Sequence, residues 1–228
     1  MITTPAPFPG EHPVSCVIFD IDGTLTQTND LIFASFNAVA AHFTGRLYSP
    51  AEIVSFFGPP EEGAIVRVVG VKRLDPAMDL FLNYYETHLK EMARLYPGIE
   101  ELLQELTRLG VPLSVFTGKG QRTTLMTLEG LDIAGYFRTI VTGNDVVDHK
   151  PSGEGITRIL QAVGCSADEA LMVGDSVGDV KAAREAGVRI ASAQWDSYAI
   201  ERLNAMGLDL VFPSVASLRD WLLPRVRK

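Results

Sequence analysis

The sequence VSCVIFDIDGTLT, residues 14–26, joins an apolar run to two closely spaced acids. Residues 14–19 are rich in β-branched and apolar side chains, which is typical of a strand buried on both faces of a parallel sheet. Because strand side chains repeat with period two, we expect the carboxylates of Asp20 and Asp22 to project to the same side. Thr24 suits a turn or a helix N-cap. The stretch therefore predicts a central strand with two acids at its carboxyl end, where open α/β sheets place their ligands.

Composition and charge favour a soluble globular protein that acts on small molecules. The chain has 228 residues, of which 46% are hydrophobic and 21% charged, enough for one core and a smaller domain. A formal net charge of −8 argues against nucleic acid or a membrane as partner, because such binding draws on clustered Lys and Arg. Two cysteines, Cys16 and Cys165, favour a reducing compartment over a disulfide framework. With no membrane-length apolar run and no signal-peptide pattern, the sequence predicts a cytoplasmic protein.

Helical periodicity replaces the strand pattern after residue 26. The apolar residues that recur on one face of the first helix are Leu31, Ile32, Phe36, Val39, Ala40 and Phe43. Shorter helices are predicted at 51–57 and 60–69 and a long one at 75–95, with no strand between them. About seventy residues of helix are too many for an ordinary crossover connection. We therefore expect residues 27–96 to form an inserted α-helical cap domain.

Strand and helix patterns alternate from residue 97 onward. A helix at 99–109 is predicted to end at Gly110, where a left-handed C-cap residue belongs. Strands are predicted at 112–116, 139–141, 170–173, 188–191 and 210–212. Helices are predicted at 121–129, 153–163, 177–186 and 215–222. This alternation implies right-handed crossovers, so we predict an α/β fold with a Rossmann-like doubly wound parallel sheet as its core, residues 1–26 and 97–228.

Three further motifs lie at or near predicted strand ends. Thr117 and Gly118 follow one strand, and they suit either an ordinary turn or an anion site with a hydroxyl and a bare N–H. Lys150 precedes a helix and is either a surface lysine or a point charge for phosphate. Asp175 and Asp179 are two carboxylates four residues apart at the start of a predicted helix. They are either part of a site, or Asp175 simply caps the helix. Taken together, the motifs favour one site over four coincidences.

The stretch FDIDGTLT, residues 19–26, resembles the first motif of the haloacid dehalogenase superfamily, most of whose members are phosphatases. The three later motifs follow in the family's order, so the resemblance spans the core from residue 14 to about 192. Trp195 is similar to a position in the phosphoglycolate phosphatase branch, although Asp196 stands where glycine is usual there. The resemblance implies a phosphatase of the phosphoglycolate phosphatase-like branch.

The acids suit hydrolysis of a phosphate monoester. Such an ester needs an oxygen nucleophile and a cation that offsets its negative charge. Asp20 would attack phosphorus and form an aspartyl-phosphate, and Asp22 would transfer protons to the leaving alcohol and from water. Oxygen-only ligands from Asp20, Asp22 and Asp175 favour Mg²⁺, and the absence of Cys and His from the cluster argues against zinc.

The resemblance also implies how the remaining residues act. The carboxylate of Asp20 and the backbone carbonyl of Asp22 would bind the metal, with Asp175 as a ligand. Asp179 would be a ligand or support one. The groups implied to hold the phosphoryl oxygens are Thr117, the N–H of Gly118, and Lys150.

The cap is expected to select the substrate. Phe57 and Glu62 lie in a segment that resembles the family's specificity loop, and a plain helix start explains the same segment equally well. We expect the substrate to be a small phosphorylated metabolite. Two alternatives stay open: a sugar-phosphate mutase similar to β-phosphoglucomutase, and a phospho-ligand binding module without turnover. Dehalogenase activity is disfavoured, because it does not use a second acid at the Asp22 position. The sequence does not distinguish a monomer from a homodimer.

Overall fold

A central parallel sheet organises the protein, as predicted. The computed structural model describes residues 13–227, and within them six strands pair in the order β5-β4-β1-β6-β7-β8. The strands are β1 (Cys16–Phe19), β4 (Leu113–Phe116), β5 (Phe137–Val141), β6 (Ala170–Gly174), β7 (Arg189–Ala193) and β8 (Val211–Phe212). Every pairing between them is parallel. All four residues of β1 are buried, because helices cover both faces of the sheet.

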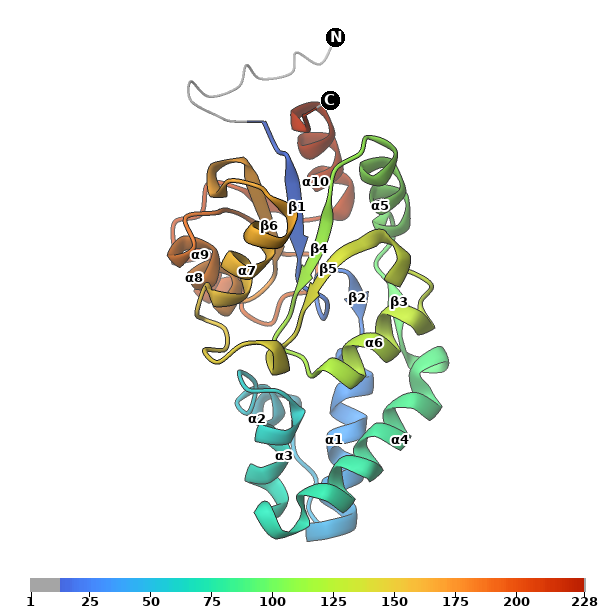
Figure 1. The fold of residues 1–228 in the computed structure, drawn as a ribbon. Coiled ribbons are helices and arrows are strands. Elements are labelled where there is room, and N and C mark those ends of the chain that lie inside the picture. The colour runs from blue at the N-terminus through green and yellow to red at the C-terminus, as the bar shows by residue number, and fades with distance from the viewer. Residues whose placement is uncertain (1–12, 228) are drawn as a thin grey trace.

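The alternation of side chains along β1 divides the core into two halves. Val17 and Phe19 pack in one hydrophobic cluster, and Cys16 and Ile18 pack in another. The helices of this part of the chain are α5 (Ile99–Arg108), α6 (Gln121–Gly130), α7 (Glu154–Val163), α8 (Val177–Glu185), α9 (Ile200–Asn204) and α10 (Val215–Leu222). Helices α5 and α10 lie on one side of the sheet and α7 and α8 on the other (Figure 1). The predicted doubly wound core is therefore confirmed.

Short 3₁₀ helices connect several of these elements. They are η1 (Val71–Arg73), η2 (Ala134–Tyr136), η3 (Gly143–Asp145), η4 (Ala167–Glu169) and η5 (Leu223–Arg225). The chain turns after α5 at Gly110, whose φ of 77° lies in the left-handed region, as predicted for that position.

Four helices form a cap beyond the carboxyl ends of the strands (Figure 1). They are α1 (Asn29–Thr44), α2 (Pro50–Val54), α3 (Glu61–Val69) and α4 (Leu74–Met92). Their apolar faces meet in a third cluster, in which the rings of Phe36 and Phe81 pack edge to face at 5.1 Å. This separate cluster supports the proposed division into core and cap at residues 26/27 and 96/97. Residues 1–12 of the proposed core lie outside the described part of the chain.

Two short strands at the ends of the cap correct the predicted helical run. Strand β2 (Thr26–Gln27) pairs antiparallel with β3 (Arg94–Leu95), so a ribbon joins the cap to the core. The long helix ends at Met92 and not at residue 95, because Ala93 is already extended. Two-residue strands are too short to show an alternating pattern, and their partners are far apart in the sequence. Helix α9 was also not predicted, because its five residues are too few to show a helical pattern.

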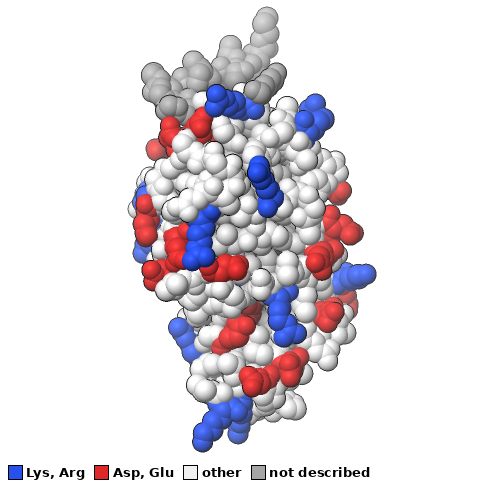
Figure 2. All heavy atoms as spheres, viewed as in Figure 1, with Lys and Arg blue, Asp and Glu red and all other residues white. Residues whose placement is uncertain are grey.

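The surface carries charges of both signs. On the face shown in Figure 2, Lys and Arg side chains lie among Asp and Glu and do not gather into one patch. Between residues 13 and 227, the structure contains no helix with the length and apolar character needed to cross a membrane.

Candidate active site

Three of the predicted acids meet at the carboxyl edge of the sheet. Asp20 directly follows β1, and its backbone N–H donates to the Val173 carbonyl of β6 at 2.9 Å. Asp175 follows β6, and Asp179 lies in the first turn of α8. One carboxylate oxygen from each of Asp20, Asp175 and Asp179 lies within 4.8 Å of the others. Adjacent parallel strands thus bring together acids that are far apart in the sequence.

The turn between β6 and α8 leaves Asp175 available to the cluster. Ser176 is the N-cap of α8, and its Oγ accepts a hydrogen bond from the Asp179 N–H at 3.1 Å. The alternative in which Asp175 caps the helix is therefore wrong. Gly23, with a φ of 82°, makes room for Asp175, because a Cβ at Gly23 would lie 2.5 Å from Asp175 Oδ2. Thr24 stabilises Asp175 by donating from Oγ1 to Oδ1 at 3.1 Å, so this threonine belongs to a turn and not to an N-cap.

Lys150 supplies a positive charge to the acid cluster. Its Nζ donates to Asp20 Oδ1 at 3.0 Å and to Asp179 Oδ1 at 2.5 Å. The ammonium also lies 4.7 Å from the centre of the Phe116 ring. Burial alone would lower the pKa of Lys150, but Asp179 and Asp20 outweigh that effect and raise it. The lysine therefore stays a cation, as a residue that offsets phosphoryl charge must.

The cluster still carries more negative charge than Lys150 offsets. Burial raises the pKa of Asp20 to about 6, with Asp179 and Asp22 adding to the effect and Lys150 opposing it. Burial likewise raises the pKa of Asp175 well above its usual range, with Asp20 and Asp179 adding to the effect. Three carboxylates with one ammonium, offering only oxygen ligands, fit a hard divalent cation.

Thr117 and Gly118 lie next to the acids at the end of β4. Both residues line the same cavity as Asp20 and Lys150. The Thr117 N–H donates to the Val141 carbonyl of β5 at 3.1 Å, which fixes the start of this loop. The structure therefore brings the predicted phosphoryl-binding groups to the predicted acids.

Asp22 lies in the cavity but outside the three-acid cluster. Its Oδ1 accepts a short hydrogen bond from Thr28 Oγ1, and its Oδ2 lies 3.3 Å from the Nζ of Lys119. The prediction that Asp20 and Asp22 share one space agrees with the cavity lining, but the two carboxylates have different partners. This separation is consistent with one acid near a cation and another free to transfer protons.

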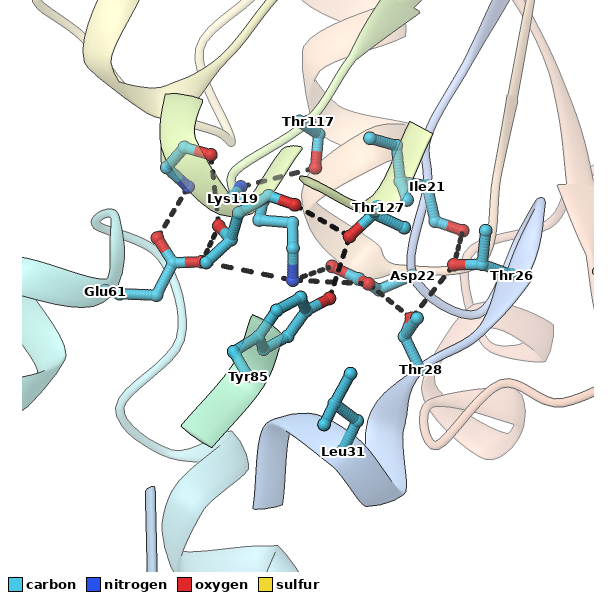
Figure 3. A network of polar contacts seen from close by, with 12 residues as sticks. Ile21, Asp22, Thr26, Thr28, Leu31, Glu61, Tyr85, Thr117, Lys119 and Thr127 are labelled. Carbon is cyan, nitrogen blue, oxygen red and sulfur yellow. Dashed lines mark hydrogen bonds and ion pairs between the residues drawn. The ribbon is translucent and has the colours of Figure 1, made fainter. Parts of the chain in front are cut away.

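Two residues at the cap boundary were not found from the sequence. Glu61 of α3 accepts hydrogen bonds from the Gly120 N–H at 2.6 Å and from Thr123 Oγ1 at 2.5 Å, both in the α6 region of the core. Lys119 Nζ lies 3.9 Å from Glu61 Oε1, so it stands between this cap acid and Asp22 (Figure 3). Lys119 directly follows Thr117-Gly118, and that position was the available signal.

A cavity of about 470 Å³ joins the cap to these residues. Phe57 lines it, as expected for a specificity residue, and its side chain is 44% exposed. Glu62 does not line the cavity, whereas its neighbour Glu61 does. Adjacent residues on a helix point about 100° apart, which explains why only one of the two glutamates lines the cavity. The specificity role expected for Glu62 stays a prediction.

Comparison with known proteins identifies the family. The sequence model of the haloacid dehalogenase-like hydrolases matches residues 17–193. The chain belongs to this family. The pyrophosphatase PpaX of Bacillus velezensis is 30% identical over 205 residues, which cover 90% of this chain and 94% of that protein. The predicted family is thereby confirmed.

Solved structures of the family agree with the fold. A predicted phosphoglycolate phosphatase from Haemophilus somnus aligns with a TM-score of 0.80 at 21% identity, covering 91% of this chain and 97% of that one. A predicted phosphatase from Clostridium acetobutylicum aligns with a TM-score of 0.75 at 25% identity, covering 93% and 99%. The prediction that the chain is a hydrolase is confirmed.

Proposed function

We propose that this hydrolase is a Mg²⁺-dependent phosphatase that cleaves the phosphate monoester of a small metabolite through an aspartyl-phosphate on Asp20. The observation that carries the proposal is the cluster of Asp20, Asp175 and Asp179 with Lys150, which opens into a cavity lined by Thr117 and Gly118. A relative named as a pyrophosphatase and a solved structure named as a predicted phosphatase support it.

The donor set supports a metal at this edge of the sheet. The carboxylates of Asp20 and Asp175 and the backbone carbonyl of Asp22 would hold Mg²⁺, and Asp179 would support them while bonded to Lys150. When bound, the cation would offset the negative charge of the phosphoryl group. Thr117, the Gly118 N–H and Lys150 would bind the phosphoryl oxygens.

Two carboxylates divide the chemistry. An oxygen of Asp20 attacks phosphorus, the bond to the ester oxygen breaks, and Asp22 gives its proton to the leaving alcohol. Asp22 then takes a proton from water, whose oxygen attacks the aspartyl-phosphate and breaks the bond to Asp20. The products are the alcohol and inorganic phosphate, and both aspartates return to their starting states.

The cap would decide which alcohol groups fit. Phe57 and Glu61 of the cap line the cavity together with Thr117 and Gly118 of the proposed phosphoryl site. A small phosphorylated metabolite suits the cavity volume. We further propose a cytoplasmic location, which the free thiols of Cys16 and Cys165 support.

A phosphate-release screen tests the proposal. The purified chain is incubated with a panel of phosphorylated metabolites and Mg²⁺, and free phosphate is measured with and without excess EDTA. We expect release that depends on Mg²⁺ and stops on chelation. Isomerised sugar phosphate without free phosphate would favour the mutase, and binding without any conversion would favour the non-catalytic module.

A further inference from the structure

Lys119 is a buried cation to which the proposed reaction gives no role. Its side chain is only 3% exposed, and its Nζ lies 3.3 Å from Asp22 Oδ2 and 3.9 Å from Glu61 Oε1. The ammonium lies 4.7 Å from the centre of the Tyr85 ring of α4 (Figure 3). Burial alone would lower the pKa of Lys119, but Asp22, Tyr85 and Glu61 together raise it above its usual value. A charge buried in this way needs its partners, because a buried charge without a partner destabilises the fold.

The contacts of Lys119 fix the direction of the Asp22 carboxylate. Thr28 Oγ1 donates to Oδ1 of Asp22, and Lys119 Nζ donates to Oδ2 at 3.3 Å and to Oδ1 at 3.5 Å. The backbone of Lys119 is itself fixed, since its N–H donates to Thr117 Oγ1 at 3.2 Å. Lys119 therefore links the proton-transferring acid to the loop proposed to bind the phosphoryl group. Proton transfer depends on such alignment between the acid and the reacting oxygen.

The same lysine contacts the cap through Glu61. Glu61 bonds to the Gly120 N–H and to Thr123 Oγ1, so α3 of the cap is docked on the start of α6. Tyr85 of the cap adds a second connection, because its hydroxyl is 2.8 Å from Thr127 Oγ1 of α6. Lys119 thus lies where two cap helices meet the core (Figure 3).

We propose that Lys119 is a positioning residue, which holds the Asp22 carboxylate toward the leaving group and ties its position to the docking of α3 through Glu61. The inference rests on the proposed function. Lys119 also lines the cavity, but its ammonium already faces Asp22, Glu61 and the Tyr85 ring. We therefore assign its effect to Asp22 and not to direct contact with the substrate.

The test compares two esters that differ in their need for a proton. The nitrophenolate that leaves 4-nitrophenyl phosphate needs little protonation. The alkoxide that leaves glycerol 1-phosphate needs a proton from Asp22. We expect Lys119→Met to lower kcat/KM for glycerol 1-phosphate by about 10²-fold, a part of the range for general acid catalysis. The loss for 4-nitrophenyl phosphate should stay below about tenfold, with KM nearly unchanged for both esters. Lys119→Arg should restore part of the loss because it keeps the charge.

Matched variants separate this role from a structural one. Lys90→Met and Glu86→Gln, at exposed positions of α4, should leave both rates unchanged. Glu61→Gln keeps the shape and removes the charge, so it should produce the same selective loss at a smaller size, about tenfold. If Lys119→Met fails to fold, the selective loss in Glu61→Gln tests the inference in its place. Equal losses for the two esters, with an active wild type, would overturn the inference alone. A wild type that releases phosphate from neither ester would overturn the proposed function and the inference with it.

Discussion

Two aspartates two positions apart have different surroundings. Asp20 is 8% exposed and bonded to Lys150 within the acid cluster, whereas Asp22 is held by Thr28 and Lys119 outside it. A buried acid beside a cation site suits a nucleophile, and a separate acid facing the leaving group suits proton transfer. The surroundings of the two side chains therefore support different roles, which substitution can distinguish.

Asp20→Asn and Asp22→Asn should fail in different ways. Asp20→Asn removes the attacking oxygen and a metal ligand together, so phosphate release should fall to background. Asp22→Asn keeps its backbone carbonyl and loses only proton transfer, which is worth typically about 10²–10⁴-fold. With 4-nitrophenyl phosphate the first step should be impaired less than the second, since attacking water still needs a base. An aspartyl-phosphate should then accumulate, and intact-mass spectrometry should detect it as a phosphate adduct. An adduct on Asp22, or an active Asp20→Asn, would contradict these roles.

The raised pKa values of the cluster predict how Mg²⁺ binding depends on pH. Burial raises the pKa of Asp20 to about 6 and that of Asp175 well above its usual range. A raised carboxyl pKa favours the protonated folded state, so this contribution to the stability of the metal-free protein is present at low pH. It is lost as the pH rises through 6. Metal binding requires the ionised forms, so protons compete with Mg²⁺.

Mg²⁺ should therefore bind more weakly at pH 5.5 than at pH 7.5. The loss from Asp20 alone should be about fourfold in Kd, because most of this group is protonated at the lower pH. Isothermal titration calorimetry at constant ionic strength measures it, and Asp20→Asn should reduce the pH dependence. Equal Kd values at the two pH values would show that protons do not compete at this site.

Residues at strand ends could be predicted, and residues at the cap boundary could not. Asp20, Thr117 and Asp175 each follow an apolar run that predicts a strand. Because the carboxyl ends of parallel strands lie at one edge of the sheet, the sequence predicts that these residues lie close together. Glu61 and Glu62 are neighbours of the same type, and the sequence does not say which one faces the core. That choice depends on how α3 packs against α6, which is a tertiary contact.

Length separates the elements that the sequence predicts from those that it does not. Helix α10 has the predicted bounds, and the longer helices and central strands agree to within a few residues. The ribbon of β2 and β3 was missed, because each strand has two residues and gains its hydrogen bonds only from the other. Helix α9 is likewise too short for a periodic pattern.

The packing of α7 on β4 depends on a glycine. A Cβ at Gly155 would lie 2.1 Å from Cε2 of Phe116, whose ring also contacts the Lys150 ammonium. Gly155→Ala should therefore destabilise the fold by about 1–3 kcal/mol, although alanine is the better helix former. Thermal unfolding should show the loss as a lower Tm, at roughly 2–4 °C per kcal/mol for a protein of this size. Gly135→Ala is the control, because nothing lies within 4 Å of a Cβ there. An unchanged Tm for Gly155→Ala would mean that Phe116 moves without cost.

Across the whole molecule, the proposed chemistry and the proposed choice of substrate lie in different parts. Asp20, Asp175 and Lys150 lie in loops at the end of the sheet, and Asp179 lies in the first turn of α8. The cap lies beyond this end of the sheet (Figure 1), and its residues also line the cavity. The chain crosses between these parts at the β2–β3 ribbon. Because the cap shares no acid with the three-acid cluster, we expect changes in the cap away from Glu61 to alter binding and leave the reaction intact.

Phe57 should therefore change the ranking of substrates more than the rate of the reaction. Its ring lines the cavity and is half exposed at the boundary, so Phe57→Ala removes apolar contact with any bulky alcohol group. We expect kcat/KM to change unequally across a panel of phosphorylated metabolites, with 4-nitrophenyl phosphate or another small ester affected least. Leu47→Ala, at an exposed position of the cap that does not line the cavity, is the control and should keep the ranking. If Phe57→Ala lowered every rate in the same proportion, the side chain would support the cap as a whole and would not select the substrate.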